Sequence, residues 1–354
     1  MSFYESAFIL VSAFVIAYFS MPGVIRLAHR WGAIDQPDFR KVHQTAMPRM
    51  GGMAIFLSFI LCMLLIVKAS GPFTGIVIGA SIVFLVGLLD DIYQLSPWLK
   101  LAGQIVASAV AIYFGVQIHF VNNPFDGMLA LGYFSIPLTF LWIVGISNAI
   151  NLIDGLDGLA AGVSSIAALT MGIVALMQGQ VMVAVVAFVL VAATLGFLPY
   201  NFFPARTFMG DGGSNFLGFT LGCLAVVGVA KSTALISLVI PIVILGIPIF
   251  DTFFAIFRRI YKKTPIFLPD KDHLHHRLLA MGFPHQTTVL IIYAISSFFG
   301  LTAIALSWLN NPKATLILAL LLLVMVIGAN RIGMLTGKAK LPARADSQRS
   351  GIHS

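Results

Sequence analysis

Aspartates are the residues best suited to chemistry in this sequence, because they are few and gather in short segments. The chain has 13 acidic residues among 354, and six of them are aspartates in four motifs. The motifs are GLLDDIYQLSP (Asp90, Asp91), NAINLIDGLDGLAAG (Asp154, Asp157), FMGDGGS (Asp211) and PIFDTFF (Asp251). Mg²⁺ is commonly bound through one or two carboxylates together with substrate phosphates. The pattern therefore favours a cation-dependent reaction of a phosphate compound.

Three of the four aspartate motifs also have a structural interpretation. Asp90 and Asp91 end a predicted helix, where acids oppose the helix dipole; a helix end exposed to water is the alternative to a functional role. Asp211 precedes a predicted helix in G-D-G-G-S, a loop whose backbone N–H groups could bind phosphate. Asp251 is interpreted as a structural partner of Arg258, seven residues later.

The second motif has a regular spacing of polar residues. Asn148, Asn151, Asp154 and Asp157 follow one another at intervals of three, which would place four oxygen-bearing side chains on one face of a helix. Because each of the two aspartates precedes a glycine, the alternative is that they are turn residues.

A cluster of histidines follows in the segment DKDHLHHRLL, with His273, His275, His276 and Arg277. Neutral-histidine metal sites usually show i, i+4 spacing or a Cys or Glu partner, and neither is present. With Lys271 and Arg277 alongside, a patch that binds anions is the favoured interpretation. A solvated basic loop that fixes membrane topology is the alternative.

Membrane-spanning helices must carry these residues, because 59% of the chain is hydrophobic and only 10% is charged. A soluble domain has about 25% charged residues, so a soluble enzyme, a secreted disulfide scaffold and a disordered chain are excluded. Crossing a bilayer takes about 20 apolar residues in a helix. The sequence predicts an all-α, polytopic integral membrane protein with about eleven spans, at residues 3–25, 50–69, 74–89, 99–118, 131–150, 158–177, 180–198, 214–230, 234–257, 287–309 and 313–330.

The orientation follows from the basic residues, which remain on the cytoplasmic side. With the N-terminus outside and the C-terminus inside, all but three of the 21 Lys and Arg residues lie inside; the exceptions are Lys68, Lys231 and Lys313. All the aspartate motifs then lie at the cytoplasmic face. We expect one transmembrane domain over residues 1–330, with active-site loops at 26–49, 90–99, 146–158, 199–213 and 258–286, and a flexible basic tail at 331–354.

Four motifs in this order give the chain a specific resemblance to the polyprenyl-phosphate N-acetylhexosamine-1-phosphate transferases. GLLDDIYQLSP resembles the family's aspartate-rich motif, NAINLIDGLDGLAAG its nucleotide motif, FMGDGGS its magnesium motif and HLHHRL its histidine motif. The pattern H-x-H-H-R resembles the branch that uses UDP-GlcNAc, rather than the branch that uses UDP-MurNAc-pentapeptide. One departure is Gln94, which stands where some members carry a further acid.

The resemblance implies a reaction and a setting. GlcNAc-1-phosphate would pass from UDP-GlcNAc to undecaprenyl phosphate with release of UMP, at the cytoplasmic face of the bacterial inner membrane. This would be the first membrane step of a cell-envelope glycan pathway, such as teichoic acid or O-antigen synthesis. The alternative donors are another UDP-N-acetylhexosamine and UDP-MurNAc-pentapeptide. Mg²⁺ or Mn²⁺ is the expected cofactor, a homodimer is the expected assembly, and no nucleic acid is expected as partner.

The resemblance also assigns roles to residues. It implies Asp90 and Asp91 as catalytic residues, and Asp211 with Asn151 as metal ligands. The first loop, RKVHQTAMPRMGG, resembles the family's loop and implies that Lys41, His43 and Arg49 hold phosphate. The remaining substrate-binding residues are expected to be Asn148, Asn151, Asp154, Asp157, His273, His275, His276 and Arg277.

The chemistry leaves the role of Asp90 open between base, orienting group and nucleophile. A phosphate monoester has a second pKa of about 6, so much of the lipid phosphate is already a dianion at neutral pH and hardly needs a base. We hypothesise a single displacement.

Two other classes of protein are the rival interpretations. One is a different membrane prenyl or alcohol transferase, whose motifs are absent. The other is a lipid or solute transporter, which would place charged residues near the bilayer midplane, whereas these spans are nearly free of charge until their inner ends.

Overall fold

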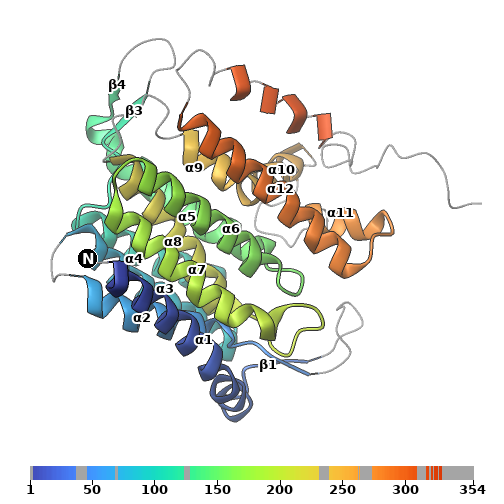
Figure 1. The fold of residues 1–354 in the computed structure, drawn as a ribbon. Helices are drawn as coiled ribbons and strands as arrows, with labels where there is room; N and C mark the ends of the chain where they lie inside the picture. The colour runs from blue at the N-terminus through green and yellow to red at the C-terminus, as the bar shows by residue number, and fades with distance from the viewer. Residues whose placement is uncertain are drawn as a thin grey trace, which may run out of the picture.

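The computed structural model describes residues 3–36, 46–67, 71–122, 128–230, 239–261, 263, 273–308 and parts of 316–328. Within these residues the protein is a bundle of long helices that run side by side (Figure 1). The helices are α1 (Phe3–Trp31), α2 (Gly52–Ile66), α3 (Pro72–Tyr93), α4 (Pro97–Tyr113), α5 (Ser135–Ile153), α6 (Leu159–Met177), α7 (Val181–Asn201), α8 (Gly210–Ala230), α9 (Val239–Ile244), α10 (Gly246–Tyr261), α11 (Leu274–Ala280) and α12 (His285–Leu306).

Two short antiparallel hairpins and one 3₁₀ turn join the helices in the described residues. Strand β1 (Ile34–Asp35) pairs with β2 (Met47–Pro48), and β3 (Phe120–Asn122) pairs with β4 (Met128–Ala130). The 3₁₀ turn (Gly132–Phe134) leads into α5. The first hairpin connects α1 to the segment that carries Arg49.

The prediction of an all-α, multi-pass membrane protein is confirmed, whereas the count of eleven spans is not. The described helices that are long and apolar enough to cross a membrane are six: Tyr4–Trp31, Pro72–Tyr93, Gly132–Ile153, Leu159–Met177, Val181–Asn201 and His285–Leu306. Helices also occupy most of the other predicted spans, and α2 has only 15 residues. The membrane orientation remains a prediction.

The predicted span 234–257 is interrupted, because α9 ends at Ile244 and α10 begins at Gly246. Pro248 lacks the N–H that would donate to the carbonyl of Ile244, so the helical ladder breaks there. The eleventh predicted span, 313–330, corresponds to an apolar helical stretch within Leu316–Met325 that is described only in part.

Helix α8 lies at the centre of the bundle and packs against α2, α3, α5, α6 and α7. Glycines allow the close approach. A Cβ on Gly87 of α3 would lie 2.6 Å from the carbonyl oxygen of Asp211, and a Cβ on Gly52 of α2 would lie 2.2 Å from the Cα of Gly213. The end of α3 and the start of α8 are therefore in direct contact, which brings two aspartate motifs together.

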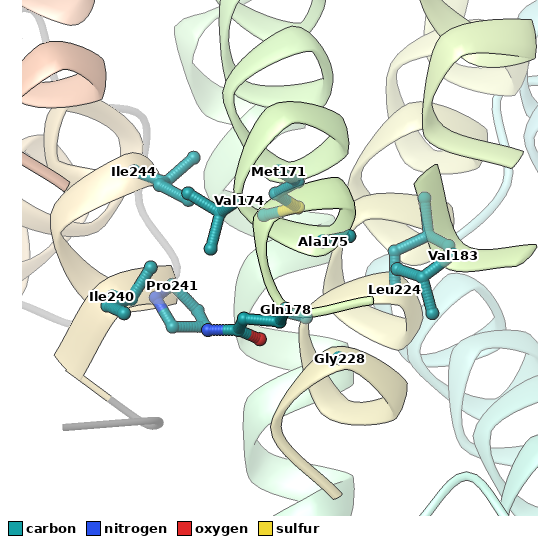
Figure 2. Close-up of a pocket in the computed structure, with 11 residues that line it drawn as sticks. Met171, Val174, Ala175, Gln178, Val183, Leu224, Gly228, Ile240, Pro241 and Ile244 are labelled. Atoms are coloured by element: carbon teal, nitrogen blue, oxygen red, sulfur yellow. The ribbon is translucent and has the colours of Figure 1, made fainter. Parts of the chain in front are cut away.

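A small apolar cavity of about 40 Å³ lies between α6, α8 and α9 (Figure 2). Met171, Val174, Leu224, Ile240 and Ile244 are among the side chains around it. Met171 and Val174 belong to the end of α6 away from Leu159, Leu224 to the end of α8 away from Asp211, and Ile240 and Ile244 to α9. The cavity is thus at the end of α8 opposite Asp211 and belongs to the packing of that end of the bundle.

Candidate active site

The first part of the site is the carboxylate cluster, which we define as Asp90, Asp91 and Asp211. Asp90 and Asp91 lie in the last turn of α3 and Asp211 in the first turn of α8. Lys100, in the first turn of α4, lies between them: its Nζ is 2.9 Å from Asp90 Oδ2 and 2.9 Å from Asp211 Oδ2. Both contacts are charge-assisted hydrogen bonds, which are stronger than neutral ones.

Asp91 holds the N-terminus of α8. Its two carboxylate oxygens accept hydrogen bonds from the backbone N–H groups of Asp211 (2.8 Å) and Gly212 (3.0 Å). A carboxylate at this position satisfies N–H groups that no helical partner can reach and interacts favourably with the helix dipole. These two N–H groups belong to the G-D-G-G-S loop, and Asp91 occupies the position where the sequence suggested a phosphate.

Asp90 shapes the turn that leads to Lys100. Its Oδ1 accepts a hydrogen bond from the backbone N–H of Leu95 at 2.7 Å, just beyond the end of α3. Gln94 adopts a left-handed conformation there, with φ of 52°, which reverses the chain into α4. The Ser96 hydroxyl then accepts from the Leu99 N–H and caps α4. The turn places Lys100 back over Asp90.

Arg49 contributes the second positive charge near the cluster. Its Nη2 lies 3.7 Å from Asp91 Oδ1 and 3.9 Å from Asp211 Oδ1, and its Nη1 lies 3.6 Å from Asp35 Oδ1. The Phe208 N–H donates to the carbonyl of Pro48 at 2.7 Å, which fixes the Arg49 segment beside the start of α8. The other residues implied for the first loop, Lys41 and His43, lie outside the described residues.

The two asparagines of the second motif are in separate surroundings. Asn151 donates from Nδ2 to Ser214 Oγ at 2.8 Å, so it lies against the first turn of α8 with Oδ1 left as an acceptor. Asn148, one turn earlier on α5, donates to Gln104 Oε1 at 2.8 Å and to the carbonyl of Val144. Gln104 in turn donates to Asn215 Oδ1 at 2.8 Å. Asn148 therefore joins a network between α4, α5 and α8 inside the bundle.

The prediction of four polar side chains on one helical face is wrong, because α5 ends at Ile153. Asp154 is the residue after the helix, and Asp157 lies in the segment that we call the α5–α6 loop, residues 154–158. Gly158 adopts φ of 77°, a conformation that glycine reaches without strain. Asp157 Oδ2 accepts from the Ala205 N–H at 3.0 Å. The turn interpretation of the two aspartates is the one that holds.

Asp154, the first residue of the α5–α6 loop, interacts electrostatically with Asp211 of the carboxylate cluster. Burial, together with the negative charges of Asp211 and Asp157, raises the pKa of Asp154 to about 7, and Arg49 opposes the rise. A carboxyl group with this pKa changes charge near neutral pH, which is common at functional sites.

The histidines lie on α11 and at its start. His273 Nδ1 is 2.8 Å from Asp251 Oδ2, and the Leu274 N–H donates to Asp251 Oδ1 at 2.8 Å. Asp251 thus has a structural role, as predicted, but the contacts seen are with His273 and Leu274; the predicted pairing with Arg258 remains a prediction.

His275 lies against the α5–α6 loop. A Cβ on Gly155 would lie 2.5 Å from His275 Nε2, and this buried nitrogen has no hydrogen-bond partner among the described residues. Burial lowers the pKa of His275 to about 3, with the neighbouring His276 acting in the same direction. His275 is therefore neutral near pH 7 and adds no charge to an anion-binding patch. The ring of His276 is 4.2 Å from that of His275, and Arg277 follows it on α11.

The donor set around the cluster fits Mg²⁺. Asp35, Asp90, Asp91 and Asp211 bring four carboxylates against the two cations Lys100 and Arg49. Within the described part of the chain, no group of three or more His, Cys, Asp or Glu side chains is arranged to hold a metal. Mg²⁺ needs no such group, since it takes one or two carboxylates and completes its shell with water and phosphate oxygens. Asp211, whose side chain is 19% exposed against 1% for Asp91, is the more accessible ligand.

Sequence reasoning did not place Lys100 in the site. Its partners lie 10 and 111 residues away in the chain, so no local spacing reveals the contact. The only signal was a lysine at the start of a predicted span in a chain with few charges.

Comparison with known proteins identifies the family. Residues 73–229 match the family described as glycosyl transferase family 4. The chain is 46% identical over 94% of both chains to the probable undecaprenyl-phosphate N-acetylglucosaminyl 1-phosphate transferase of Bacillus subtilis (strain 168). It is 36% identical to the decaprenyl-phosphate N-acetylglucosaminephosphotransferase of Mycobacterium tuberculosis (strain H37Rv), over 88% of this chain and 84% of the relative.

A third relative is the undecaprenyl-phosphate alpha-N-acetylglucosaminyl 1-phosphate transferase of Thermotoga maritima, 33% identical over 82% of this chain and 88% of the relative. These matches extend over nearly the whole chain and confirm the resemblance seen in the four motifs. The protein is a multi-pass membrane transferase that belongs to glycosyl transferase family 4, the family of these polyprenyl-phosphate GlcNAc-1-phosphate transferases.

Proposed function

We propose that the protein transfers GlcNAc-1-phosphate from UDP-GlcNAc to undecaprenyl phosphate and releases UMP. The observation that carries the proposal is the carboxylate cluster with Lys100 at its centre, next to the α5–α6 loop. Acids and cations from α3, α4, α8 and the Arg49 segment meet at one end of an apolar bundle. The names of the relatives support GlcNAc as the sugar and undecaprenyl phosphate as the acceptor.

The divalent cation would be held by Asp211 with the Oδ1 of Asn151, whose Nδ2 is already bonded to Ser214. When bound, Mg²⁺ would neutralise charge on the diphosphate and orient it for displacement. Asp91 keeps Asp211 in place by fixing the backbone of the first turn of α8. Asp91 would therefore act as a positioning residue for the metal ligand.

The nucleotide would bind at the α5–α6 loop, beneath α11. Asp154, Gly155 and Asp157 would supply the loop part of this site; His275, which packs against Gly155, and His276 would supply the α11 part. His273, oriented by Asp251, would donate to phosphate from its other nitrogen. Arg277 would add positive charge where the leaving UMP develops negative charge.

The lipid phosphate would approach beside Asp90. A phosphate oxygen attacks the phosphorus that bears the sugar, the bond to the UMP oxygen breaks, and its electron pair leaves with UMP. Lys100 lies between Asp90 and Asp211, where it would steady the reacting phosphates as charge moves between them. Asp90 would orient the lipid head group or accept its last proton. The basic residues of the loops at this end support a cytoplasmic location for the site.

Purified protein in nanodiscs tests the proposal, with UDP-GlcNAc, undecaprenyl phosphate and Mg²⁺ as reactants and UMP as the measured product. Parallel reactions contain UDP-GalNAc or UDP-MurNAc-pentapeptide in place of UDP-GlcNAc, and EDTA in place of Mg²⁺. We expect UMP only with Mg²⁺ and at the highest rate with UDP-GlcNAc. No UMP from any of the three donors would refute the proposed function, and a preference for another donor would refute the assignment of the sugar.

A further inference from the structure

We propose that His285, the first residue of α12, is a positioning residue that holds the α5–α6 loop in the shape required for nucleotide binding. The inference rests on the proposed function, in which this loop binds the nucleotide. His285 lies outside the HLHHRL motif and was not among the residues expected in the site.

The α5–α6 loop depends on other elements for its hydrogen bonds. The Asp157 N–H donates to His285 Nε2 at 3.1 Å, and the Gly158 N–H donates to Asn201 Oδ1 at 3.1 Å. The Tyr293 hydroxyl, two turns further along α12, donates to the Gly158 carbonyl. Two of these three partners come from α12, a helix about 130 residues later in the chain. The shape of the loop therefore depends on where α12 begins.

His285 also connects the loop to the segment after α7. Its ring packs on Phe203, with centroids 4.8 Å apart. The same segment supplies the Ala205 N–H that binds the Asp157 carboxylate at 3.0 Å. The backbone of Asp157 is thus bound by His285, and its side chain is bound by a segment that His285 packs against.

The hydrogen bond requires one form of the imidazole. A backbone N–H donates to Nε2, so Nε2 must carry its lone pair and the proton of the neutral ring is on Nδ1. Nδ1 is buried and has no hydrogen-bond partner in the described part of the chain. A phenylalanine would pack on Phe203 equally well, but it could not accept the hydrogen bond, so packing alone does not account for an imidazole here.

Matched variants separate the acceptor from the ring. His285→Phe keeps an aromatic ring against Phe203 and removes the acceptor. His285→Gln removes the ring but brings a carbonyl oxygen to the position of Nε2. Leu290→Ala, on the exposed side of the same helix, is the control. All are measured as full-length protein in nanodiscs, by UMP release at varied UDP-GlcNAc and varied undecaprenyl phosphate and by amide hydrogen exchange of the segment 154–159.

In the His285→Phe variant we expect the KM for UDP-GlcNAc to rise roughly fivefold, the ratio for one lost hydrogen bond, with kcat within about twofold of wild type. The KM for undecaprenyl phosphate should stay unchanged, because in the proposed function the lipid phosphate binds beside Asp90 and not at this loop. Exchange of the segment 154–159 should accelerate. His285→Gln should restore both quantities toward wild type, and Leu290→Ala should alter neither.

Several outcomes would overturn the inference. These are a wild-type KM for UDP-GlcNAc in His285→Phe, faster exchange without a change in KM, and an equal loss for both substrates that parallels a lower unfolding temperature. A failure of His285→Gln to restore the KM would also refute the role of the acceptor. Wild-type protein that releases no UMP from any UDP-sugar refutes the proposed function, whereas active wild type with an unaffected His285→Phe variant refutes only the role of His285.

Discussion

Replacing Lys100 by methionine keeps most of the side-chain volume and removes the positive charge that lies between Asp90 and Asp211. Each of its two contacts is 2.9 Å long. At an effective dielectric constant of about 20, unit charges at that distance attract by about 6 kcal/mol before desolvation is counted. A hydrogen bond to a charged group retains about 1.5–3 kcal/mol net. The Lys100 side chain is 29% exposed, so we take the lower part of the range and expect a total loss of about 3 kcal/mol.

In the proposed reaction Lys100 exchanges these contacts for the reacting phosphates in the transition state, and a loss of similar size there would lower kcat about 100-fold, measured by UMP release. The variant should also unfold at a lower temperature without Mg²⁺, because Asp90 and Asp211 then repel each other. Mg²⁺ should reduce the difference in unfolding temperature between the variant and the wild type, since it binds the folded protein and replaces the missing positive charge. Lys100→Arg, which keeps the charge, is the control and should be less affected in both measurements. A Lys100→Met variant with wild-type kcat, or with a stability loss that Mg²⁺ leaves unchanged, would refute this reasoning.

Three further predictions follow from single contacts. Asp91→Asn turns an amide N–H toward the N-terminus of α8 and should lower the free energy of unfolding by about 1–3 kcal/mol in denaturant titrations; unchanged stability would contradict the capping role. The pKa of Asp154 is raised to about 7 in the folded protein and is about 4 in the unfolded chain, so the folded state binds more protons between these values. The free energy of unfolding should therefore decrease as the pH rises from about 4 to about 7. Asp154→Asn should flatten that fall in thermal unfolding at varied pH. Gly155→Ala would bring a Cβ to 2.5 Å from His275 Nε2 and displace the loop, so kcat/KM for UDP-GlcNAc should drop about 10–100-fold in the UMP assay.

The sequence was informative about features that depend on local composition. Long apolar runs predict helices, and the helices lie where those runs are, because a backbone in lipid must satisfy its own hydrogen bonds. The errors arose where one residue interrupts a run. Pro248 breaks the predicted span 234–257 into α9 and α10, and the apparent helical face ends with α5 at Ile153, before a loop in which Gly158 adopts a positive φ. Composition averaged over a window does not register such single residues.

Contacts between distant segments were beyond local reasoning. The motifs predicted which residues lie at one end of the bundle, but they did not predict which residues each one contacts. His275 was grouped with charged neighbours because of its spacing, yet its burial against Gly155 keeps it neutral. Lys100 and His285 were overlooked because their partners are far away in sequence. Pairing of this kind depends on the relative positions of several helices.

The adjacent acids at the end of α3 show why such a pairing is needed. Considered within α3 alone, two carboxylates at a helix C-terminus are unfavourable, because both face the negative end of the dipole. In the structure, Asp91 reaches the N-terminus of α8, where the dipole has the opposite sign and two backbone N–H groups lack helical partners. Asp90 turns the other way, to the Leu95 N–H and Lys100. The unfavourable interaction with the α3 dipole is thus offset by the hydrogen bonds of Asp91 to α8 and of Asp90 to Leu95 and Lys100. Asp90 and Asp91 therefore link α3, α4 and α8 and fix the position of Asp211 at the start of α8.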